Sequence, residues 1–437
     1  MKISALVLSF LISAFVSYAQ TWQSVGNKFN DEVVCLLHDS VNNLLYASGR
    51  FDTIGTTAVN KIAKWNGTAW SPLGPGLSNG YVTSMMFYNN QLYAGGTFTA
   101  SGSNTRFFFT RWGGSSWDSV AFTTGNCNVQ CMVVYNGKLI VGGGFPTAGG
   151  FVVNNIASFN GTQWDSLRSG TNGTVFAMAV YNNELYIAGS FDTVSGIAAK
   201  HLAKWNGTTW SAVGGGLNNV VYALEVHSGK LYVGPHFTQA GSINASYIAT
   251  WNGTTWNTVG SGMNHRVDVI YSAGDKLYAG GWFTNTGGNS ANRVAKWNGT
   301  TWSAIGTGMN SPVQALAIYN SQLYAGGGFT QASNASNYYI AKADTFITSS
   351  LIDQTFKANF NIYPNPFNAT TTIAVSPYKD DLSVKVFSLY GQQLRTLKLE
   401  TEKTHFNRNE LSDGLYLFVL HEGNTAIAKR AIIVNSK

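Results

Sequence analysis

Apolar and polar residues alternate along most of the chain in short runs that end at glycine or asparagine. In the stretch 210–256, period-two alternation predicts β-strands, because successive side chains of a strand point to opposite faces. Asn252-Gly253 predicts a tight type I′ hairpin turn, in which both central residues need a positive φ. The predicted strands of this stretch are Val220–Val226, Leu231–Phe237, Tyr247–Trp251 and Thr255–Val259, with a polar loop at Thr238–Ala245.

The same four-strand unit returns seven times. Its marker is a tryptophan that recurs at spacings of 48, 47, 47, 46, 46 and 46 residues. Four antiparallel strands per repeat at this period are typical of a propeller blade, so an all-β, seven-bladed β-propeller is predicted. The tryptophans are Trp22, Trp70, Trp117, Trp164, Trp210, Trp256 and Trp302.

The two ends of the repeat predict that the units close into a ring. The seventh unit has strands at Val313–Tyr319, Leu323–Phe329 and Tyr338–Lys342, but no fourth strand follows them. The segment Thr21–Gly26 resembles an isolated fourth strand. Pairing the two would remove an open sheet edge, whereas an open solenoid would need capping repeats at its ends.

Residues 21–346 resemble kelch and galactose-oxidase-type propellers. The resemblance rests on aliphatic strands that end in paired glycines and on strands that carry tryptophan. It implies the architecture and no specific kelch function, because the glycine-to-tryptophan spacing and the regular NGTxW hairpin depart from kelch. The residues that carry it are Gly95-Gly96, Gly142-Gly143, Gly280-Gly281, Gly326-Gly327, Trp65, Trp205, Trp251 and Trp297.

The pattern changes after the propeller segment, 20–346. A polar linker is predicted at 347–358, and the segment 359–437 loses tryptophan and gains charge. Its short alternating strands predict a small C-terminal immunoglobulin-like β-sandwich. These strands are Thr370–Ser376, Leu382–Ser388, Leu415–His421 and Ala426–Val434.

The segment 359–437 closely resembles the type A C-terminal sorting domain of the type IX secretion system. The resemblance implies that the type IX translocon reads this tail, which is usually cut off, and that the cargo is released or linked to surface lipopolysaccharide. The alternative is an ordinary accessory sandwich. The sorting-signal residues are Tyr363, Pro364, Asn365, Pro366, Gly391, Gly414, Lys429 and Arg430.

The first nineteen residues read as a signal peptide. Lys2 gives a positive start, Leu6–Val16 is apolar, and Ser17-Tyr18-Ala19 is a small-x-small cleavage site. The apolar run is too short for a transmembrane helix, which needs about 20 residues. A secreted or outer-membrane surface location is therefore expected, with no transmembrane segment in the mature chain.

Composition narrows the possible functions. The chain has 437 residues, of which only 11% are charged, and its net charge of +7 is spread without a basic run. Nucleic-acid binding needs a concentrated basic patch and is not expected. The sequence offers no metal-binding motif, cofactor motif or catalytic constellation. Cys35 and Cys131 share one strand position with small residues of other units and are expected to be free, packed thiols.

Features shared by all units are interpreted as structural. The tryptophan pairs beside each Asn-Gly turn could stack on sugars, but cross-strand packing explains their recurrence better. The Asn-Gly-Thr triplets match the N-glycosylation pattern, although the turn alone requires Asn-Gly. The hairpin Trp205–Trp210 resembles the aspartate box of sialidases, but Trp205 stands where that motif has its aspartate.

One position after the paired glycines varies freely between units and is the candidate ligand site. Arg50, His236 and Trp282 occupy it, and the preceding loop of the sixth unit adds His265 and Arg266. A patch of Trp, His and Arg could bind a polar or anionic glycan by stacking and charged hydrogen bonds. A varied, solvated rim is the alternative. The full set at this position is Arg50, Thr97, Gly144, Ser190, His236, Trp282 and Gly328.

Three functions remain open from the sequence. The first is a surface or secreted binding module for a glycan or a protein. The second is a propeller lyase or hydrolase acting on polysaccharide, with His236 or His265 opposed to Asp31, Glu32 or Asp268. The third is a structural surface protein. No catalytic residue, cofactor or metal is predicted, and the oligomeric state stays open.

Overall fold

The computed structural model describes two compact units, divided between Thr345 and Phe346. The predicted signal peptide and linker, Pro366 and Gly391 lie outside the described residues, and each unit is described by itself. The described residues are 21–105, 108–123, 127–234, 236–333, 335–343, 359–365, 367–376, 378–388, 393–409, 411–412, 414–422 and 425–434.

Within its described residues, the first unit contains seven four-stranded antiparallel sheets, here numbered I to VII in chain order of their first strands. The first strands are β2 (Val33–Asp39), β8 (Val82–Tyr88), β14 (Asn128–Tyr135), β20 (Val175–Tyr181), β26 (Ala223–His227), β32 (Val267–Ala273) and β38 (Val313–Tyr319). The second strands are β3 (Leu44–Gly49), β9 (Gln91–Gly96), β15 (Lys138–Gly144), β21 (Glu184–Gly189), β27 (Lys230–Gly234), β33 (Lys276–Gly281) and β39 (Gln322–Gly327).

In sheets I to VI, the third and fourth strands flank the turn that carries the aromatic pair. The third strands are β6 (Ile62–Trp65), β12 (Phe109–Trp112), β18 (Ile156–Phe159), β24 (Leu202–Trp205), β30 (Ala249–Trp251), β36 (Val294–Trp297) and β42 (Ile340–Ala343). The fourth strands are β7 (Trp70–Pro72), β13 (Trp117–Ser119), β19 (Trp164–Ser166), β25 (Trp210–Ala212), β31 (Trp256–Thr258), β37 (Trp302–Ala304) and, for sheet VII, β1 (Trp22–Ser24).

Each predicted polar loop carries a two-stranded hairpin that the sequence pattern does not reveal. In sheet V, the Asn218 side chain accepts hydrogen bonds from the backbone N–H groups of Thr238 and Gln239, which fixes the start of this hairpin. The hairpins are β4 (Thr53–Ile54) with β5 (Thr57–Ala58), β10 (Ala100–Ser101) with β11 (Asn104–Thr105), β16 (Thr147–Ala148) with β17 (Phe151–Val152), β22 (Thr193–Val194) with β23 (Ile197–Ala198), β28 (Gln239–Ala240) with β29 (Ile243–Asn244), β34 (Asn285–Thr286) with β35 (Asn289–Ser290), and β40 (Gln331–Ala332) with β41 (Ala335–Ser336).

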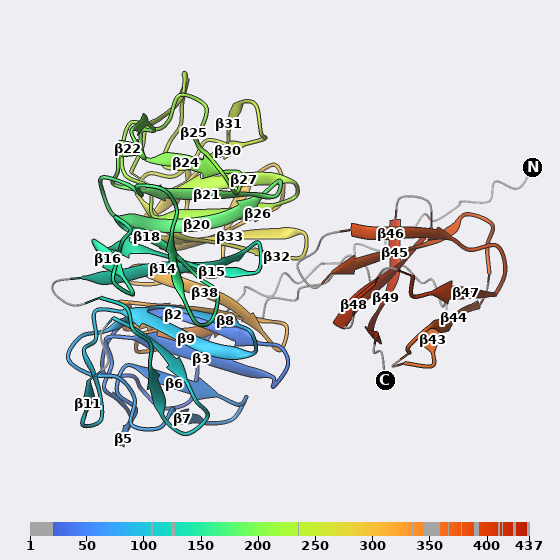
Figure 1. The fold of residues 1–437 in the computed structure, drawn as a ribbon, viewed down its shortest axis with the longest axis horizontal. Helices are drawn as coiled ribbons and strands as arrows, with labels where there is room; N and C mark the ends of the chain where they lie inside the picture. Colours follow the sequence, from blue (N-terminus) through green and yellow to red (C-terminus); the bar gives the residue numbers. More distant parts are fainter. Residues whose placement is uncertain are drawn as a thin grey trace, which may run out of the picture. The chain divides into compact units, whose positions relative to one another are not determined.

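The sheets follow one another in a propeller-like arrangement. The first strand of each sheet contacts the first strand of the next, and β38 lies beside β2 (Figure 1), so the last sheet contacts the first. Strand β1 pairs with β42, with Trp22 opposite Ala343 and Gln23 opposite Lys342. The expected pairing of the segment around Trp22 with the strand near Lys342 is therefore present.

Each fourth-strand tryptophan links its sheet to the preceding one. Its indole N–H donates to a backbone carbonyl just after the fourth strand of that neighbour, so the aromatic ring both fills the inter-sheet core and saturates a polar group. Trp22 donates to Ile305 at 2.9 Å and Trp70 donates to Val25 at 3.0 Å. These two bonds connect sheet VII to its neighbours on both sides.

The structure explains the recurring tryptophan pairs and Asn-Gly turns by packing. Trp205 and Trp210 face each other across their turn with ring centroids 5.1 Å apart, and both are buried. The Asn206 side chain accepts hydrogen bonds from the backbone N–H groups of Thr208 and Thr209. Because Gly207 has a φ of 102°, this turn requires glycine.

The described residues of the second unit form two sheets that share a hydrophobic core, which includes Phe360, Ile373, Val386 and Phe418. One sheet contains β43 (Asn359–Tyr363), β44 (Thr370–Ser376) and β47 (Lys403–Asn407). The other contains β46 (Gln393–Lys398), β45 (Leu382–Ser388), β48 (Gly414–Glu422) and β49 (Thr425–Val434). The limits of β44 and β45 agree with the strands expected from the sequence.

Candidate functional site

The varied position after each second strand lies where that strand ends and the first strand begins. The backbone N–H of Arg50 donates to Glu32 at 2.9 Å, and that of Trp282 donates to Arg266 at 2.8 Å. The same bond occurs at Thr97, Ser190 and Gly328, and the His236 ring contacts that of Tyr222 beside the first strand of sheet V. The varied side chains therefore share one side of the first unit, here called the loop face.

A strained backbone position contributes further varied side chains to the loop face. A residue one or two positions before each third strand has a positive φ without being glycine, and its N–H donates to a phenylalanine carbonyl just after the second strand. A non-glycine residue with a positive φ is strained and persists only where neighbouring contacts hold its backbone. The backbone conformation is therefore the same in each sheet, while the side chain at this position differs from sheet to sheet. The residues at this position are Lys61, Phe108, Asn155, His201, Tyr247, Arg293 and Tyr339.

Seven side chains from sheets V and VI gather on this face, and we call them the rim cluster. The Arg266 guanidinium lies 5.0 Å from the ring centroid of Trp282 and 5.9 Å from that of Tyr222. Trp282 is 40% exposed and Tyr222 is 36% exposed, which is unusual for rings of this size in this fold. The members of the rim cluster are Tyr222, His236, Tyr247, His265, Arg266, Asp268 and Trp282.

Asp268 holds the rim cluster together. Its Oδ1 atom lies 2.8 Å from Arg266 Nε, and the carboxylate also accepts a hydrogen bond from the Trp282 side chain. Burial raises the pKa of Asp268 to about 6, against the opposing effect of Arg266. The carboxylate therefore fixes both the guanidinium and the indole, so the aromatic surface is preorganised before any ligand arrives.

Two histidines border the aromatic surface. The His236 and Tyr222 ring centroids lie 5.7 Å apart, and His265 stacks on Tyr247 at 6.3 Å. Burial, with the positive charge of Arg266 and the neighbouring His265, lowers the pKa of His236. His265 Nδ1 accepts the backbone N–H of Arg266, so this side chain also fixes the entry into β32.

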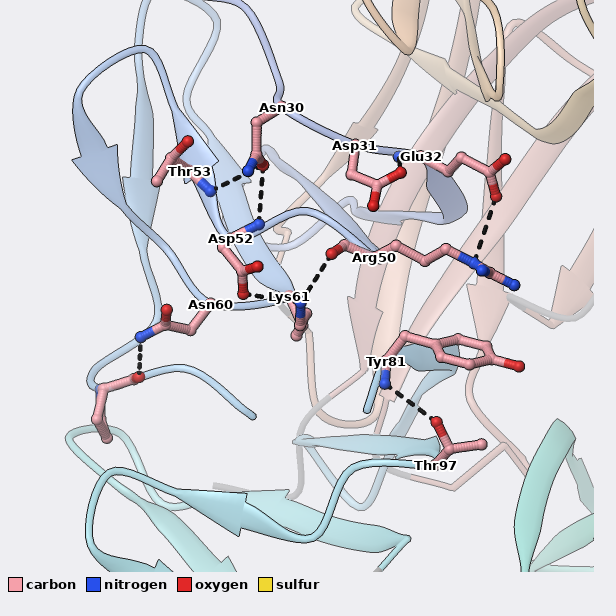
Figure 2. A network of polar contacts seen from close by, with 11 residues as sticks. Asn30, Asp31, Glu32, Arg50, Asp52, Thr53, Asn60, Lys61, Tyr81 and Thr97 are labelled. Atoms are coloured by element: carbon pink, nitrogen blue, oxygen red, sulfur yellow. Dashed lines mark hydrogen bonds and ion pairs between the residues drawn. The ribbon is translucent and has the colours of Figure 1, made fainter. Parts of the chain in front are cut away.

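Arg50 belongs to a different place on the loop face. Its guanidinium lies 4.7 Å from the ring centroid of Tyr81, and its Nε atom lies 3.4 Å from Glu32 Oε2 (Figure 2). These residues come from sheets I and II. Of the five residues predicted to form one patch, the structure thus brings His236, His265, Arg266 and Trp282 together and places Arg50 with other partners.

Of the carboxylates proposed as partners of His236 or His265, Asp268 lies in the rim cluster with both histidines, whereas Asp31 and Glu32 lie just before the first strand of sheet I. Asp31 accepts the backbone N–H of Glu32, Glu32 pairs with Arg50, and Asp268 pairs with Arg266. Each carboxylate is therefore already engaged by a neighbour.

Among the described residues, no group of three His, Cys, Asp or Glu side chains could hold a metal ion. No helix in the described part of the chain is long and apolar enough to cross a membrane.

Sequence reasoning missed Tyr222 and Tyr247 and named Asp268 only as a possible catalytic acid. Asp268 lies at a β-bulge between Val267 and Val269, where the register of β32 against β33 shifts. The position of Asp268 in the first strand varies between units as freely as the position after the paired glycines. Comparing the units at this position would therefore have marked it as a candidate for the site. The residues at this position are Val34, Thr83, Gln130, Phe176, Tyr222, Asp268 and Gln314.

Four of the described sorting-signal residues lie at strand ends of the second unit. Tyr363 ends β43, with Pro364 and Asn365 directly after it, and Gly414 begins β48. The backbone of Lys429 and Arg430 lies in β49.

Several solved structures resemble this chain at low sequence identity. One is the extracellular domain of a protein described as a hybrid two component system of B. thetaiotaomicron, with a TM-score of 0.49 and 12% identity, covering 96% of this chain and 60% of that one. Another is PorZ, a surface component of the type-IX secretion system of Porphyromonas gingivalis, with a TM-score of 0.45 and 14% identity, covering 94% of this chain and 60% of that one.

A third is the WD40 β-propeller domain of Doa1, with a TM-score of 0.46 and 14% identity, covering 74% of this chain and 96% of that one. The chain thus spans about three-fifths of the length of the first two of these proteins.

No curated protein matches the chain. Residues 275–298 match a beta-propeller domain of unknown function, in agreement with the repeated sheets. Residues 361–435 match the secretion system C-terminal sorting domain. This match implies handling by the type IX secretion machinery and a location outside the cell or on the outer-membrane surface.

Proposed function

We propose that this protein is an extracellular binding module that presents a glycan-binding site on the loop face of a rigid propeller. The observation that carries the proposal is the pair of exposed rings, Trp282 and Tyr222, on either side of Arg266. Exposed aromatic rings beside fixed polar groups suit a sugar, which offers a C–H face for stacking and hydroxyl groups for hydrogen bonds.

The proposed architecture is a closed propeller of seven blades, 20–346, followed by a linker, 347–358, and an immunoglobulin-like sorting domain, 359–437. The contact of β38 with β2 and the bond from Trp22 to Ile305 support closure, since an open array would leave both ends uncovered. The sorting-domain match over 361–435 supports the last boundary. A signal peptide, 1–19, and export by the type IX system complete the proposal.

A glycan array with the purified full-length protein tests the binding function, with a reducing-end assay in parallel to detect cleavage. Binding without turnover is expected. Trp282→Ala and His236→Ala should each lower the affinity of the recognised glycan about tenfold or more, because each removes a contact worth about 1–2 kcal/mol.

Phe151→Ala is the matched control for these variants, since Phe151 is 57% exposed on the outer hairpin of sheet III. Binding that survives both rim-cluster substitutions would show that the site is wrong. Turnover of a bound polysaccharide would favour a lyase or hydrolase instead. Failure to bind any glycan on the array would favour a protein ligand or a structural role.

A further inference from the structure

The combination of arginine, carboxylate and aromatic ring that builds the rim cluster occurs a second time on the loop face. Arg50 stacks on Tyr81 and pairs with Glu32 (Figure 2), as Arg266 stacks on Trp282 and pairs with Asp268. In both places the residue after the second strand donates its N–H to the residue before the first strand, so the backbone frame is the same.

The two sets lie on different pairs of sheets. The first involves sheets I and II and the second involves sheets V and VI, so sheets III and IV lie between them in one direction along the ring of contacts and sheet VII lies between them in the other. The Arg50 and Glu32 side chains are 51% and 32% exposed, which leaves donors and acceptors free for a ligand.

We infer that Glu32, Arg50 and Tyr81 form a second subsite, and that this subsite and the rim cluster together bind one extended, neutral glycan chain. The inference rests on the proposed glycan-binding function and adds the class and length of the ligand. A guanidinium beside a carboxylate presents donors and acceptors next to each other, which matches a vicinal diol of a pyranose. The adjacent ring stacks on the C–H face of the same sugar.

The charge of the two subsites favours a neutral chain over an anionic one. Each arginine lies within ion-pair distance of its own carboxylate, at 3.4 Å for Arg50 and 2.8 Å for Arg266. Little net positive charge therefore remains at either subsite to attract a polyanion. Two weak subsites on one rigid unit gain affinity for a chain long enough to reach both, because the second contact becomes intramolecular.

Affinity electrophoresis of the full-length protein tests the inference with four soluble polymers: galactomannan, mixed-linkage β-glucan, xyloglucan and, as the anionic comparison, polygalacturonate. Titration calorimetry then uses a hydrolysis ladder of the polymer that retards the protein. Two- to three-sugar fragments should bind with a stoichiometry of two per protein, and long chains should bind more tightly with a stoichiometry of one.

Four variants separate the subsites: Tyr81→Ala, Trp282→Ala, the double variant and the control Phe151→Ala. Each single variant should reduce the stoichiometry for short fragments to one and weaken long-chain binding about 100-fold, which is the lower end of the gain expected from bivalency. The double variant should not bind. Unchanged unfolding midpoints would show that all four variants are folded.

The outcomes separate the inference from the function on which it rests. If Tyr81→Ala binds long chains as the wild type does while Trp282→Ala does not, the second subsite is wrong and the rim cluster stands. Retardation by polygalacturonate alone would overturn the neutral ligand. A wild-type protein that binds on the glycan array while none of the three neutral polymers retards it would overturn the inference alone. A protein that binds no glycan in either assay would contradict the proposed glycan-binding function as well.

Discussion

At the scale of single residues, Glu225 stands out as a carboxyl group among the first strands. Its side chain accepts the backbone N–H of Ser272 in the next sheet, and burial raises its pKa to about 8. Five of the six equivalent positions in the other sheets are apolar, namely Leu37, Met86, Val133, Ala179 and Ala317, and the sixth is Tyr271.

Stability should therefore fall as the pH rises from about 4.5 to 8. In this window the folded protein keeps Glu225 protonated while the unfolded chain ionises it, so the unfolded state binds fewer protons. The expected loss is about 1.4 kcal/mol for each pH unit. Urea unfolding at several pH values should show that Glu225→Gln lacks this loss between pH 6 and 8, above the pKa of about 6 of Asp268.

The control for this measurement is Glu184→Gln, because Glu184 pairs with Lys204 at 2.7 Å in a partly exposed place. This variant should keep the pH dependence of the wild type. Equal pH dependence in the wild type and in Glu225→Gln would contradict the prediction.

Two thiols of the first unit should be unreactive in the folded protein. Burial raises the pKa of Cys35 to about 11 and raises the pKa of Cys131 as well. A shift of two units lowers the thiolate fraction about 100-fold, and only the thiolate reacts. A variant that retains Cys35 alone should react with Ellman's reagent at pH 8 at least about 100-fold faster after unfolding in urea. Fast labelling of the folded form would rule this out.

Single positions also show the limit of sequence reasoning about the site. The varied position after the second strand is visible in the repeat, and the structure places His236 and Trp282 in one cluster with Arg266. The repeat pattern alone could not show that Arg50 lies apart from these residues. Residues at equivalent positions are neighbours only when their sheets are adjacent, and Arg50 belongs to sheet I. Comparing the units could identify Tyr222 as a varied position, but its contacts with Phe176 and His236 could not be predicted, because they cross from one sheet to another or to a loop.

At the scale of the strands, the three residues of β1 are expected to contribute strongly to the stability of the first unit. Trp22 is 3% exposed, packs in the core of sheet VII and donates its indole N–H to Ile305. Trp22→Ala should destabilise the first unit by about 3–5 kcal/mol, because it leaves a cavity and an unpaired carbonyl. Guanidinium unfolding measures the change.

Trp22→Phe is the matched variant, since it keeps most of the ring and removes only the N–H donor. Its cost should be smaller, about 1–2 kcal/mol. If both substitutions leave the unfolding midpoint unchanged, β1 does not contribute to the stability of sheet VII.

The strands were predictable where side-chain periodicity is long enough to read. The Asn-Gly turns and tryptophans located the third and fourth strands, since a turn and its two aromatic flanks form one local signal. The hairpins in the polar loops were not predictable, because strands of two residues have no period. Their start is fixed by a side chain from another loop, such as Asn218.

At the scale of the whole molecule, the chain divides between the unit of seven repeated sheets and the unit that matches the sorting domain. Deleting 359–437 should trap the protein in the periplasm, because this deletion removes the segment that matches the sorting domain over 361–435. Cell fractionation and immunoblotting measure the distribution. Fusing the same residues to a periplasmic reporter should send that reporter outside the cell, and a deleted protein that still leaves the cell would refute the assignment.

The pairing of β1 with β42 couples the local unfolding of β1 to the unfolding of the other sheets. Strand β1 meets its partner only when every intervening sheet holds its place, because its neighbours in sequence and in space lie at opposite ends of the first unit. Amide hydrogen exchange at Gln23 would thus report on the integrity of all seven sheets, since loosening any of them frees this short segment to open first.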